Sequence, residues 1–149
     1  YEMGLAGVVL SNHGGRQLDF ARSGVEVLEE VMRELRKRGS FPNPAFQVMV
    51  DGGFRRGTDI LKALAMGATA VGIGRPFLYA YSAYGVDGVI HAINLLRDEL
   101  EMNMRLIGAR SIEELVPSMV DLSALHNHTG AVFPKQDQSV LDFMEKSRL

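Results

Sequence analysis

Three short runs rich in apolar residues divide the first half of the chain. They occupy residues 7–10, 46–50 and 70–73, and polar residues or glycines follow each of them. A short apolar run of this kind is typical of a strand that is buried on both faces of a parallel sheet. The runs therefore predict three strands, each of which ends in a polar or glycine-rich loop.

Helical spacing of apolar residues fills the stretches between and after these runs. Ser23 opens a capping box, and the spacing that follows predicts a helix over 24–37. A second helix is expected from about Gly57 and ends before Gly67. The longest helical segment is predicted over 86–107. Its apolar stripe consists of Val89, Ile90, Ile93, Leu96, Leu100, Met104 and Ile107.

The order of these elements decides the fold class. Strands that alternate with helices at this spacing indicate right-handed βαβ units and a parallel sheet, so the chain is predicted to be α/β. From about His126 onward the sequence becomes polar and less periodic, which predicts a C-terminal tail with little chemistry.

Composition narrows the class of function. The chain has 149 residues, of which 46% are hydrophobic, enough for one globular unit with a core. Sixteen basic and eighteen acidic residues give a formal charge of -2, which offers no bulk attraction to nucleic acid or to an anionic membrane. With no cysteine, the chain has no disulfide, zinc-thiolate site or thiol nucleophile. Chemistry on a small molecule is the better expectation.

The loop at 11–19, directly after the first predicted strand, carries a histidine and an arginine three residues apart. The glycines at 14 and 15 leave room for a ligand beside the backbone. Imidazole accepts protons near neutral pH, which makes His13 a candidate base. The planar fork of Arg16 suits a carboxylate. A lone histidine would more often satisfy a carbonyl group, but this pairing favours a site at the rim of a barrel enzyme.

Two further loops have the composition of a phosphate site. They follow the second and third predicted strands, and in a (β/α)₈ barrel the loops after the last two strands commonly bind phosphate. Arg55 and Arg75 would neutralise the phosphate, and Asp51 would accept hydrogen bonds from a ribityl or ribosyl hydroxyl. Arg56 is expected to face solvent or a carboxylate. The glycines that free backbone N–H groups are Gly52, Gly53 and Gly74.

Together, the motifs at 11–19, 51–59 and 74–77 closely resemble those of the FMN-dependent α-hydroxy acid oxidases and dehydrogenases. The resemblance extends over about 4–122. It implies that the chain is the C-terminal part of a TIM (β/α)₈ barrel, in which the three predicted strands correspond to the sixth, seventh and eighth.

The resemblance also suggests a branch and a domain organisation. Residues 96–102 and 121–123 look most like the fungal branch that passes electrons from L-lactate to cytochrome c, the flavocytochromes b2. We expect 1–125 to form the C-terminal portion of the barrel domain and 126–149 to form the tail. Since the chain begins at Tyr1 and is already entering a strand, we also expect it to be a fragment.

Carried over residue by residue, the resemblance implies roles for the candidate site. His13 would be the catalytic base, and Arg16 would bind the substrate carboxylate. The family's cofactor-binding positions are matched by Asp51, Gly52, Gly53, Arg55, Gly74 and Arg75. No metal ligand is expected, because His91, His126 and His128 have no recognisable metal spacing.

The implied reaction is oxidation of an (S)-2-hydroxy acid, with L-lactate as the expected substrate, to the 2-oxo acid as FMN is reduced. Residue types leave open whether the base takes the hydroxyl proton or the α-carbon proton. Cytochrome c, oxygen and a quinone all remain possible electron acceptors, and a haem domain would lie upstream. The full-length enzyme is expected to be a homo-oligomer, a tetramer by resemblance, with no membrane span.

The resemblance also implies that some residues of the family's active site are missing from these three strands. The family's lysine near the flavin, its substrate-binding tyrosine and the aspartate that orients the histidine all lie in earlier parts of the barrel. We therefore expect this chain alone neither to oxidise hydroxy acids nor to bind FMN tightly.

Two other classes of function stay open. The chain could belong to a flavin-free, phosphate-binding barrel isomerase or synthase, or be an inactive truncated product or pairing half.

Overall fold

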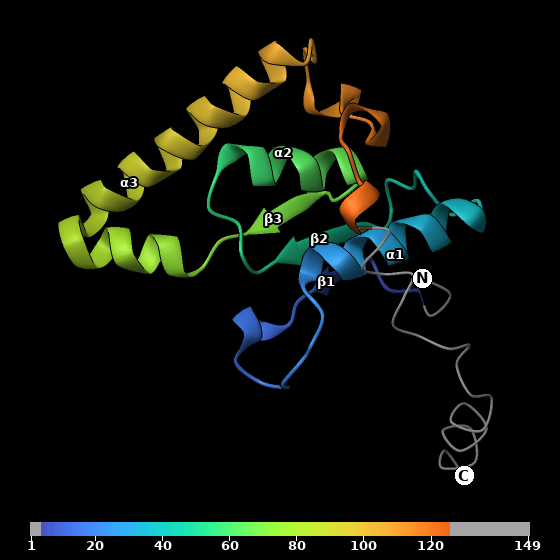
Figure 1. Cartoon of the computed structure of the whole chain (residues 1–149), viewed down its shortest axis with the longest axis horizontal. Helices are drawn as coiled ribbons and strands as arrows, with labels where there is room; N and C mark the ends of the chain where they lie inside the picture. Colours follow the sequence, from blue (N-terminus) through green and yellow to red (C-terminus); the bar gives the residue numbers. More distant parts are fainter. Residues whose placement is uncertain (1–3, 126–149) are drawn as a thin grey trace.

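The computed structural model describes residues 4–125 and places them in an α/β arrangement (Figure 1). Three parallel strands alternate with helices, as the sequence predicts. In chain order the elements are β1 (Gly7–Leu10), η1 (His13–Gly15), α1 (Gly24–Lys37), β2 (Gln47–Asp51), α2 (Gly57–Met66), β3 (Ala70–Gly72), α3 (Arg75–Leu106), η2 (Ile112–Glu114) and η3 (Pro117–Met119), where η marks a single-turn 3₁₀ helix. The predicted tail over 126–149 lies outside the described residues.

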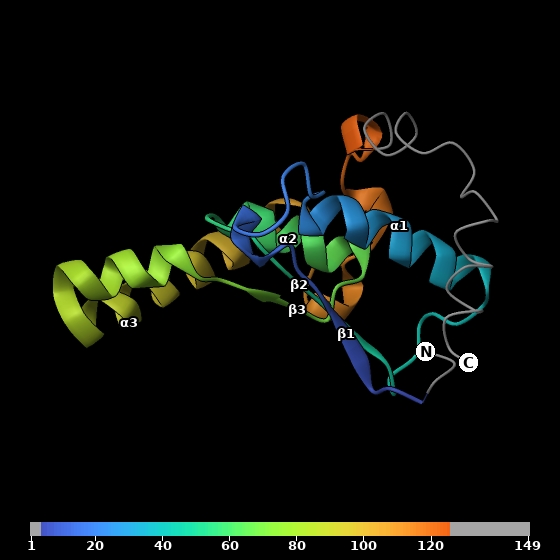
Figure 2. The ribbon, with the colours of Figure 1, turned by 90° about the horizontal axis from the view of Figure 1, so that it is seen from below.

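The sheet has the strand order β1-β2-β3, so β2 is central and pairs with both neighbours. In the register, Val8 lies opposite Val48, and Val50 lies opposite Val71. Figure 2 shows α1 and α2 on one side of the strands. Val48 and Val50 are buried on that side, and the alternate positions of β2 face the other way.

The helix boundaries follow local sequence signals. The predicted capping box is confirmed: Glu26 N donates to Ser23 Oγ at 3.3 Å, and Ser23 N donates to the Glu26 carboxylate at 2.8 Å. The helix α1 spans the predicted residues. Helix α2 ends at Met66, before Gly67, whose φ of 114° lies in the left-handed region, as a C-terminal glycine stop requires.

Two strand boundaries differ from the prediction by one residue. The strand predicted over 46–50 occupies Gln47–Asp51, because Phe46 N donates to Asn43 O in a turn at 3.1 Å. The strand predicted over 70–73 ends at Gly72. The first correction matters for the site, because it makes Asp51 the last residue of β2 rather than a loop residue.

One main hydrophobic core lies between the sheet and the first two helices. It joins α1, β2 and α2, and its buried members are Leu10, Leu28, Met32, Val48, Val50, Phe54, Ala63, Met66 and Ala68. A second, smaller cluster lies under the end of α3 and consists of Leu61, Ala65, Ala109 and Leu115. These cores fix the strands whose carboxyl ends carry the candidate site.

Helix α3 corrects the prediction for the longest helix. It begins at Arg75 instead of 86 and is interrupted at Tyr84 and Gly85, where Gly85 adopts φ 60°. Its two segments turn back on each other (Figure 1). Their contact requires Gly88, where a Cβ atom would lie 2.3 Å from Ala80 O.

The predicted apolar stripe on this helix is only partly covered. Leu100 and Met104 pack on the smaller core, but Ile90 and Ile93 are 51% and 48% exposed. The reason is that the earlier turns of the second segment extend past α2, and within the described residues the first segment of α3 covers them only in part (Figure 1).

Candidate active site

The loop after β1 forms a compact turn. His13 N donates to Ser11 Oγ at 3.0 Å, and Arg16 N donates to His13 O at 3.3 Å, which closes the single turn η1. His13 adopts φ 58°, in the left-handed region that non-glycine residues rarely occupy. Such a conformation persists only where the surroundings hold it, and it is found preferentially at functional sites.

The His13 ring has a partner that the sequence reasoning missed. Gln17 Nε2 lies 2.9 Å from His13 Nδ1, four residues further along the chain. A glutamine amide offers either a donor or an acceptor, so Gln17 suits both tautomers of a neutral imidazole. The His13 and Gln17 side chains are both exposed. The Arg16 side chain makes no hydrogen bond or ion pair with any residue in 4–125.

Asn12 connects this loop to its surroundings. Its side-chain oxygen accepts from Gly15 N at 3.1 Å, and its Nδ2 donates to Arg22 O at 3.2 Å. The same oxygen would lie 3.4 Å from a Cβ atom at Gly52, in the loop after β2. From the sequence Asn12 was expected, with Gly14 and Gly15, to leave room for a ligand; its hydrogen-bonding role was not predicted, although an asparagine before two turn glycines is a local signal for it.

Asp51 ends β2 with a buried and unsatisfied oxygen. Its Oδ1 is inaccessible to solvent and has no hydrogen-bond partner among the described residues. In the register it lies opposite Gly72 of β3, where a Cβ atom would come within 3.0 Å of the Asp51 Cβ. Gly52 and Gly53 follow with φ of 86° and 88°, which turn the chain sharply away from the strand.

The next part of this loop is held by two carboxylates. Asp59 accepts from the backbone N–H groups of Arg55 and Arg56, each at 3.0 Å. Glu99 of α3 accepts from Arg56 Nε at 2.8 Å and from Gly57 N at 2.7 Å. The expectation that Arg56 faces solvent or a carboxylate is thus confirmed. Hydrogen bonds from Arg56 and from Gly57 N hold the pKa of Glu99 below its usual value.

Arg55 is different from its neighbour. Its side chain is exposed and makes no ion pair or hydrogen bond with any residue in the described range 4–125. The buried ring of Phe54 anchors the backbone just before it. The loop therefore presents one guanidinium group that the surrounding structure does not use.

The third loop contacts the first. Arg75 Nη2 donates to Gly14 O at 2.8 Å. Gly74 precedes it as the N-cap of α3, with no side chain to cap the helix. Figure 1 shows the β2 and β3 arrows pointing to the side of the molecule on which η1 and the start of α3 lie. Asn12 and Arg75 thus bring the three predicted loops to one edge of the sheet.

This edge has the features that a phosphorylated polyol needs. Asp51 offers a buried acceptor without a partner, the glycines leave the backbone open, and the exposed guanidinium groups of Arg16 and Arg55 are unpaired within 4–125. A polyol hydroxyl would satisfy the carboxylate, and phosphate binds well to arginine and to free backbone N–H groups. The residues present therefore fit FMN.

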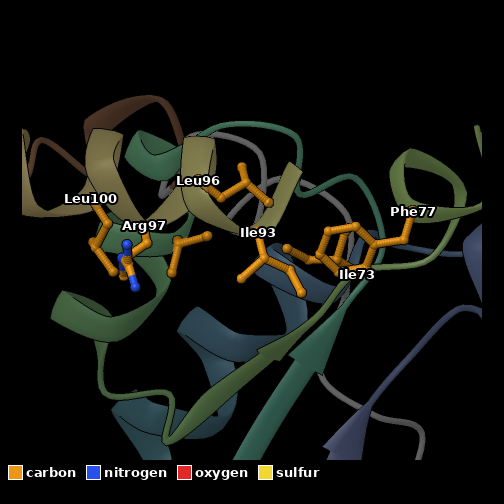
Figure 3. Close-up of a pocket in the computed structure, with 7 residues that line it drawn as sticks. Ile73, Phe77, Ile93, Leu96, Arg97 and Leu100 are labelled. Atoms are coloured by element: carbon orange, nitrogen blue, oxygen red, sulfur yellow. The ribbon is translucent and has the colours of Figure 1, made fainter. Parts of the chain in front are cut away.

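A separate cavity of about 230 Å³ opens on the helical side of the molecule. Figure 3 shows its lining side chains, which include Phe77 from the first segment of α3, Ile93, Leu96, Arg97 and Leu100 from the second, and Ile73. Its lining consists of Ile60, Ile73, Phe77, Ile93, Leu96, Arg97 and Leu100. It contains none of the predicted site residues, and its surface is almost entirely apolar, so we do not place the chemistry there.

Other kinds of site have no support in the described part of the chain. No helix within 4–125 is sufficiently long and apolar to cross a membrane. Nor does this range contain a cluster of three or more histidine or carboxylate side chains arranged to hold a metal ion.

Comparisons with known proteins agree on one family. The sequence profile of the FMN-dependent dehydrogenases matches residues 1–122. The L-lactate dehydrogenase (cytochrome) of Wickerhamomyces anomalus is 61% identical over 126 residues, which cover 85% of this chain and 22% of that protein. The Saccharomyces cerevisiae enzyme of the same name is 59% identical over 131 residues, with 88% and 22% covered. The chain thus spans about a fifth of the length of these relatives.

Solved structures give the same result for the fold. A flavocytochrome b2 variant with pyruvate bound aligns with a TM-score of 0.80 and 53% identity, over 95% of this chain and 35% of the other. A mandelate oxidase variant aligns with a TM-score of 0.69 and 42% identity, over 78% and 33%. The three-stranded unit corresponds to about a third of the TIM-barrel domain of flavocytochrome b2.

Proposed function

Because this chain belongs to the FMN-dependent dehydrogenase family, we propose that it supplies the half of a 2-hydroxy acid dehydrogenase site that carries the base, the carboxylate clamp and the phosphate loops. In this proposal residues 1–125 form the C-terminal portion of the barrel domain. One observation carries the proposal: the loops after all three strands meet at one edge, where Arg75 is bonded to Gly14 O and Gly52 lies beside Asn12.

His13 acts as the base in this proposal. A neutral imidazole takes a proton from the (S)-2-hydroxy acid and becomes cationic. The Gln17 amide lies 2.9 Å from Nδ1 and restricts rotation of the ring. For Nε2 to accept the substrate proton, Nδ1 must carry the ring hydrogen, so the amide would present its oxygen to Nδ1. Arg16, three residues further on, binds the substrate carboxylate with two parallel N–H groups, which places the hydroxyl-bearing carbon near the base.

FMN is held by the second and third loops. The buried Oδ1 of Asp51 accepts from a ribityl hydroxyl, and the glycines at 52, 53 and 74 allow the cofactor to approach the backbone. Arg55 and Arg75 bind the phosphate. When bound, FMN accepts the two electrons that leave the substrate.

L-Lactate is the proposed substrate and cytochrome c the proposed electron acceptor. Both proposals rest on the two relatives at about 60% identity, each of which is named L-lactate dehydrogenase (cytochrome). The haem that flavocytochrome b2 carries would belong to another part of the full-length protein. We further propose that the chain alone is inactive, because the family's lysine, tyrosine and orienting aspartate come from earlier barrel strands.

A chimera tests this function. Residues 1–125 replace the matching segment of the Saccharomyces cerevisiae L-lactate dehydrogenase (cytochrome), and flavin absorbance and L-lactate-dependent bleaching are measured. The chimera should bind FMN and bleach on adding L-lactate. His13→Gln should retain FMN and slow bleaching by about a thousandfold or more, within the range expected for loss of a general base. His91→Gln, at an exposed position of α3, is the matched control.

Two outcomes would count against the proposal. Equal bleaching rates in the chimera and its His13→Gln variant would remove the base assignment. A folded chimera that binds a sugar phosphate but no flavin would favour the isomerase or synthase class instead.

A further inference from the structure

The hydrogen bond between Arg75 and Gly14 joins two loops with different proposed tasks. Arg75 Nη2 donates to Gly14 O at 2.8 Å, although the two residues are 61 positions apart in the chain. A Cβ atom at position 14 would lie 3.3 Å from the same Nη2 atom, so the guanidinium lies close against the backbone of this glycine. An arginine proposed to bind phosphate thus already contacts the loop that carries the proposed base.

The carbonyl that accepts this bond is close to His13 in the chain. Three consecutive residues, His13, Gly14 and Gly15, have φ of 58°, 64° and 73°. The two glycines adopt this conformation readily, but at His13 it is unfavourable unless other contacts hold it. The bonds within the turn come from Ser11 and Asn12, which belong to the same loop. Arg75 provides an anchor from outside the loop.

The guanidinium group of Arg75 has enough donors to bind the Gly14 carbonyl and a phosphate at the same time. The group has five N–H donors in a rigid plane, and the bond to Gly14 O uses one of them. The others remain available to a phosphate at the start of α3. A bound phosphate would fix the plane of the guanidinium and, through it, the Gly14 carbonyl.

We propose that Arg75 is a positioning residue for His13 in addition to its role at the phosphate, so that an occupied phosphate site holds the loop of the base in place. This inference rests on the proposed function, because it takes His13 as the base and Arg75 as a phosphate ligand. Arg55 has no such second contact among the described residues. It is therefore the matched control on the neighbouring loop.

The first experiment needs no ligand. Amide hydrogen exchange of Gly15 and Arg16 is measured by NMR in the ¹⁵N-labelled chain and in its Arg75→Lys and Arg55→Lys variants. Arg75→Lys keeps the charge but loses the planar fork, and it should speed exchange in this turn at least threefold. Arg55→Lys should leave exchange unchanged. The Val48 amide, in the buried strand β2, reports whether each variant keeps its fold.

The second experiment adds inorganic phosphate. In the original chain, the Gly53 and Gly74 amides and the His13 ring protons should shift together with one apparent Kd. In Arg75→Lys, Gly53 and Gly74 should still respond, with weaker affinity, whereas the His13 ring should not. If Arg75 had only a structural role, the His13 ring protons of Arg75→Lys would still shift when phosphate binds.

The failures are distinguishable. Unchanged exchange in Arg75→Lys, or a His13 ring that still follows phosphate in that variant, overturns the positioning role and leaves the proposed function intact. A lack of any phosphate response in the original chain overturns both the coupling and the assignment of the phosphate loops.

Discussion

At the scale of single residues, the space around Asp51 depends on a glycine in the neighbouring strand. Gly72 lies opposite Asp51 in the register, and a Cβ atom there would lie 3.0 Å from the Asp51 Cβ. Few observed Cβ contacts are so short, so a side chain at position 72 would push the carboxylate away from its buried position.

Gly72→Ala should therefore weaken FMN binding in the chimera by about tenfold. A tenfold loss corresponds to about 1.4 kcal/mol, similar to the net value of one good hydrogen bond. Titration of the apo chimera with FMN, followed by flavin fluorescence, measures the effect. Ala70→Ser, two positions earlier on the same strand, should bind FMN normally. An unchanged affinity for Gly72→Ala would show that Asp51 does not need this space.

At the scale of elements, Glu99 joins α3 to the start of α2. Its carboxylate accepts from Gly57 N, the first residue of α2, and from the Arg56 side chain. A negative charge at a helix N-terminus is favourable, and here it is supplied by another helix. The two helices approach closely at this point, because a Cβ atom at Gly57 would lie 2.5 Å from Leu100 N.

This contact predicts a pH dependence. The Arg56 hydrogen bond, followed by that from Gly57 N, lowers the pKa of Glu99 from the ordinary value of 4.5. Since the folded state favours the ionised carboxylate, its contribution to the free energy of unfolding is present above about pH 4.5 and lost as the pH falls through the lowered pKa. Glu99→Gln should be less stable than the original chain at neutral pH.

Urea unfolding at a series of pH values checks this expectation. The stability difference between the original chain and Glu99→Gln should narrow below about pH 4.5. Glu101→Gln, on the same helix, is the control, because Glu101 pairs with Arg105 and not with α2. A difference that stays constant down to about pH 3 would contradict the assignment.

The elements also indicate how far sequence reasoning reaches. Helix α1 was predictable from end to end, because Ser23 and Glu26 cap it through contacts three residues apart. The strand ends that carry His13, Asp51 and Arg75 were predictable because the loops there directly follow the three apolar runs, although Asp51 itself ends β2 and Arg75 begins α3. The contact of Arg56 with some carboxylate was expected, but Glu99 was not identifiable, since the pair is 43 residues apart.

Helix α3 shows why other features were not predictable. Its first segment contains exposed Leu78, Tyr79 and Tyr81, so no amphipathic pattern marks it as a helix. The predicted apolar stripe on the second segment includes Ile90, and this side chain is exposed in the described structure. A periodic pattern identifies which residues favour burial, but it does not identify what buries them.

At the scale of the whole molecule, the sheet has two unpaired edges within the described residues, β1 and β3. On β1, Val9 is 59% exposed, and Leu5 just before it is 62% exposed. An exposed apolar edge strand favours pairing with another chain. The chain spans about a third of the solved flavocytochrome b2 structure. In such relatives, the rest of the barrel is available to pair with these edges.

We therefore expect the isolated chain to self-associate through β1. Val9→Lys should shift it toward the monomer, because a charged lysine on an edge strand opposes pairing. Sedimentation velocity over a range of concentrations measures the effect. Phe20→Lys is the control, since Phe20 is more exposed than Val9, at 104%, but lies in a loop outside the sheet. A chain that remains monomeric at every concentration, or equal effects of both variants, would contradict the role of the edge.

The contacts of Asn12 and Arg75 have a consequence for inheritance. Arg75 is bonded to the loop after β1, and Asn12 of that loop lies beside Gly52, so the three loops meet within one continuous stretch of chain, from the end of β1 to the start of α3. A recombination event with breakpoints outside that stretch would transfer the proposed base, carboxylate clamp and phosphate loops together with the Arg75–Gly14 bond. Homologous genes could thus exchange this block and alter the remaining barrel without separating residues that depend on one another.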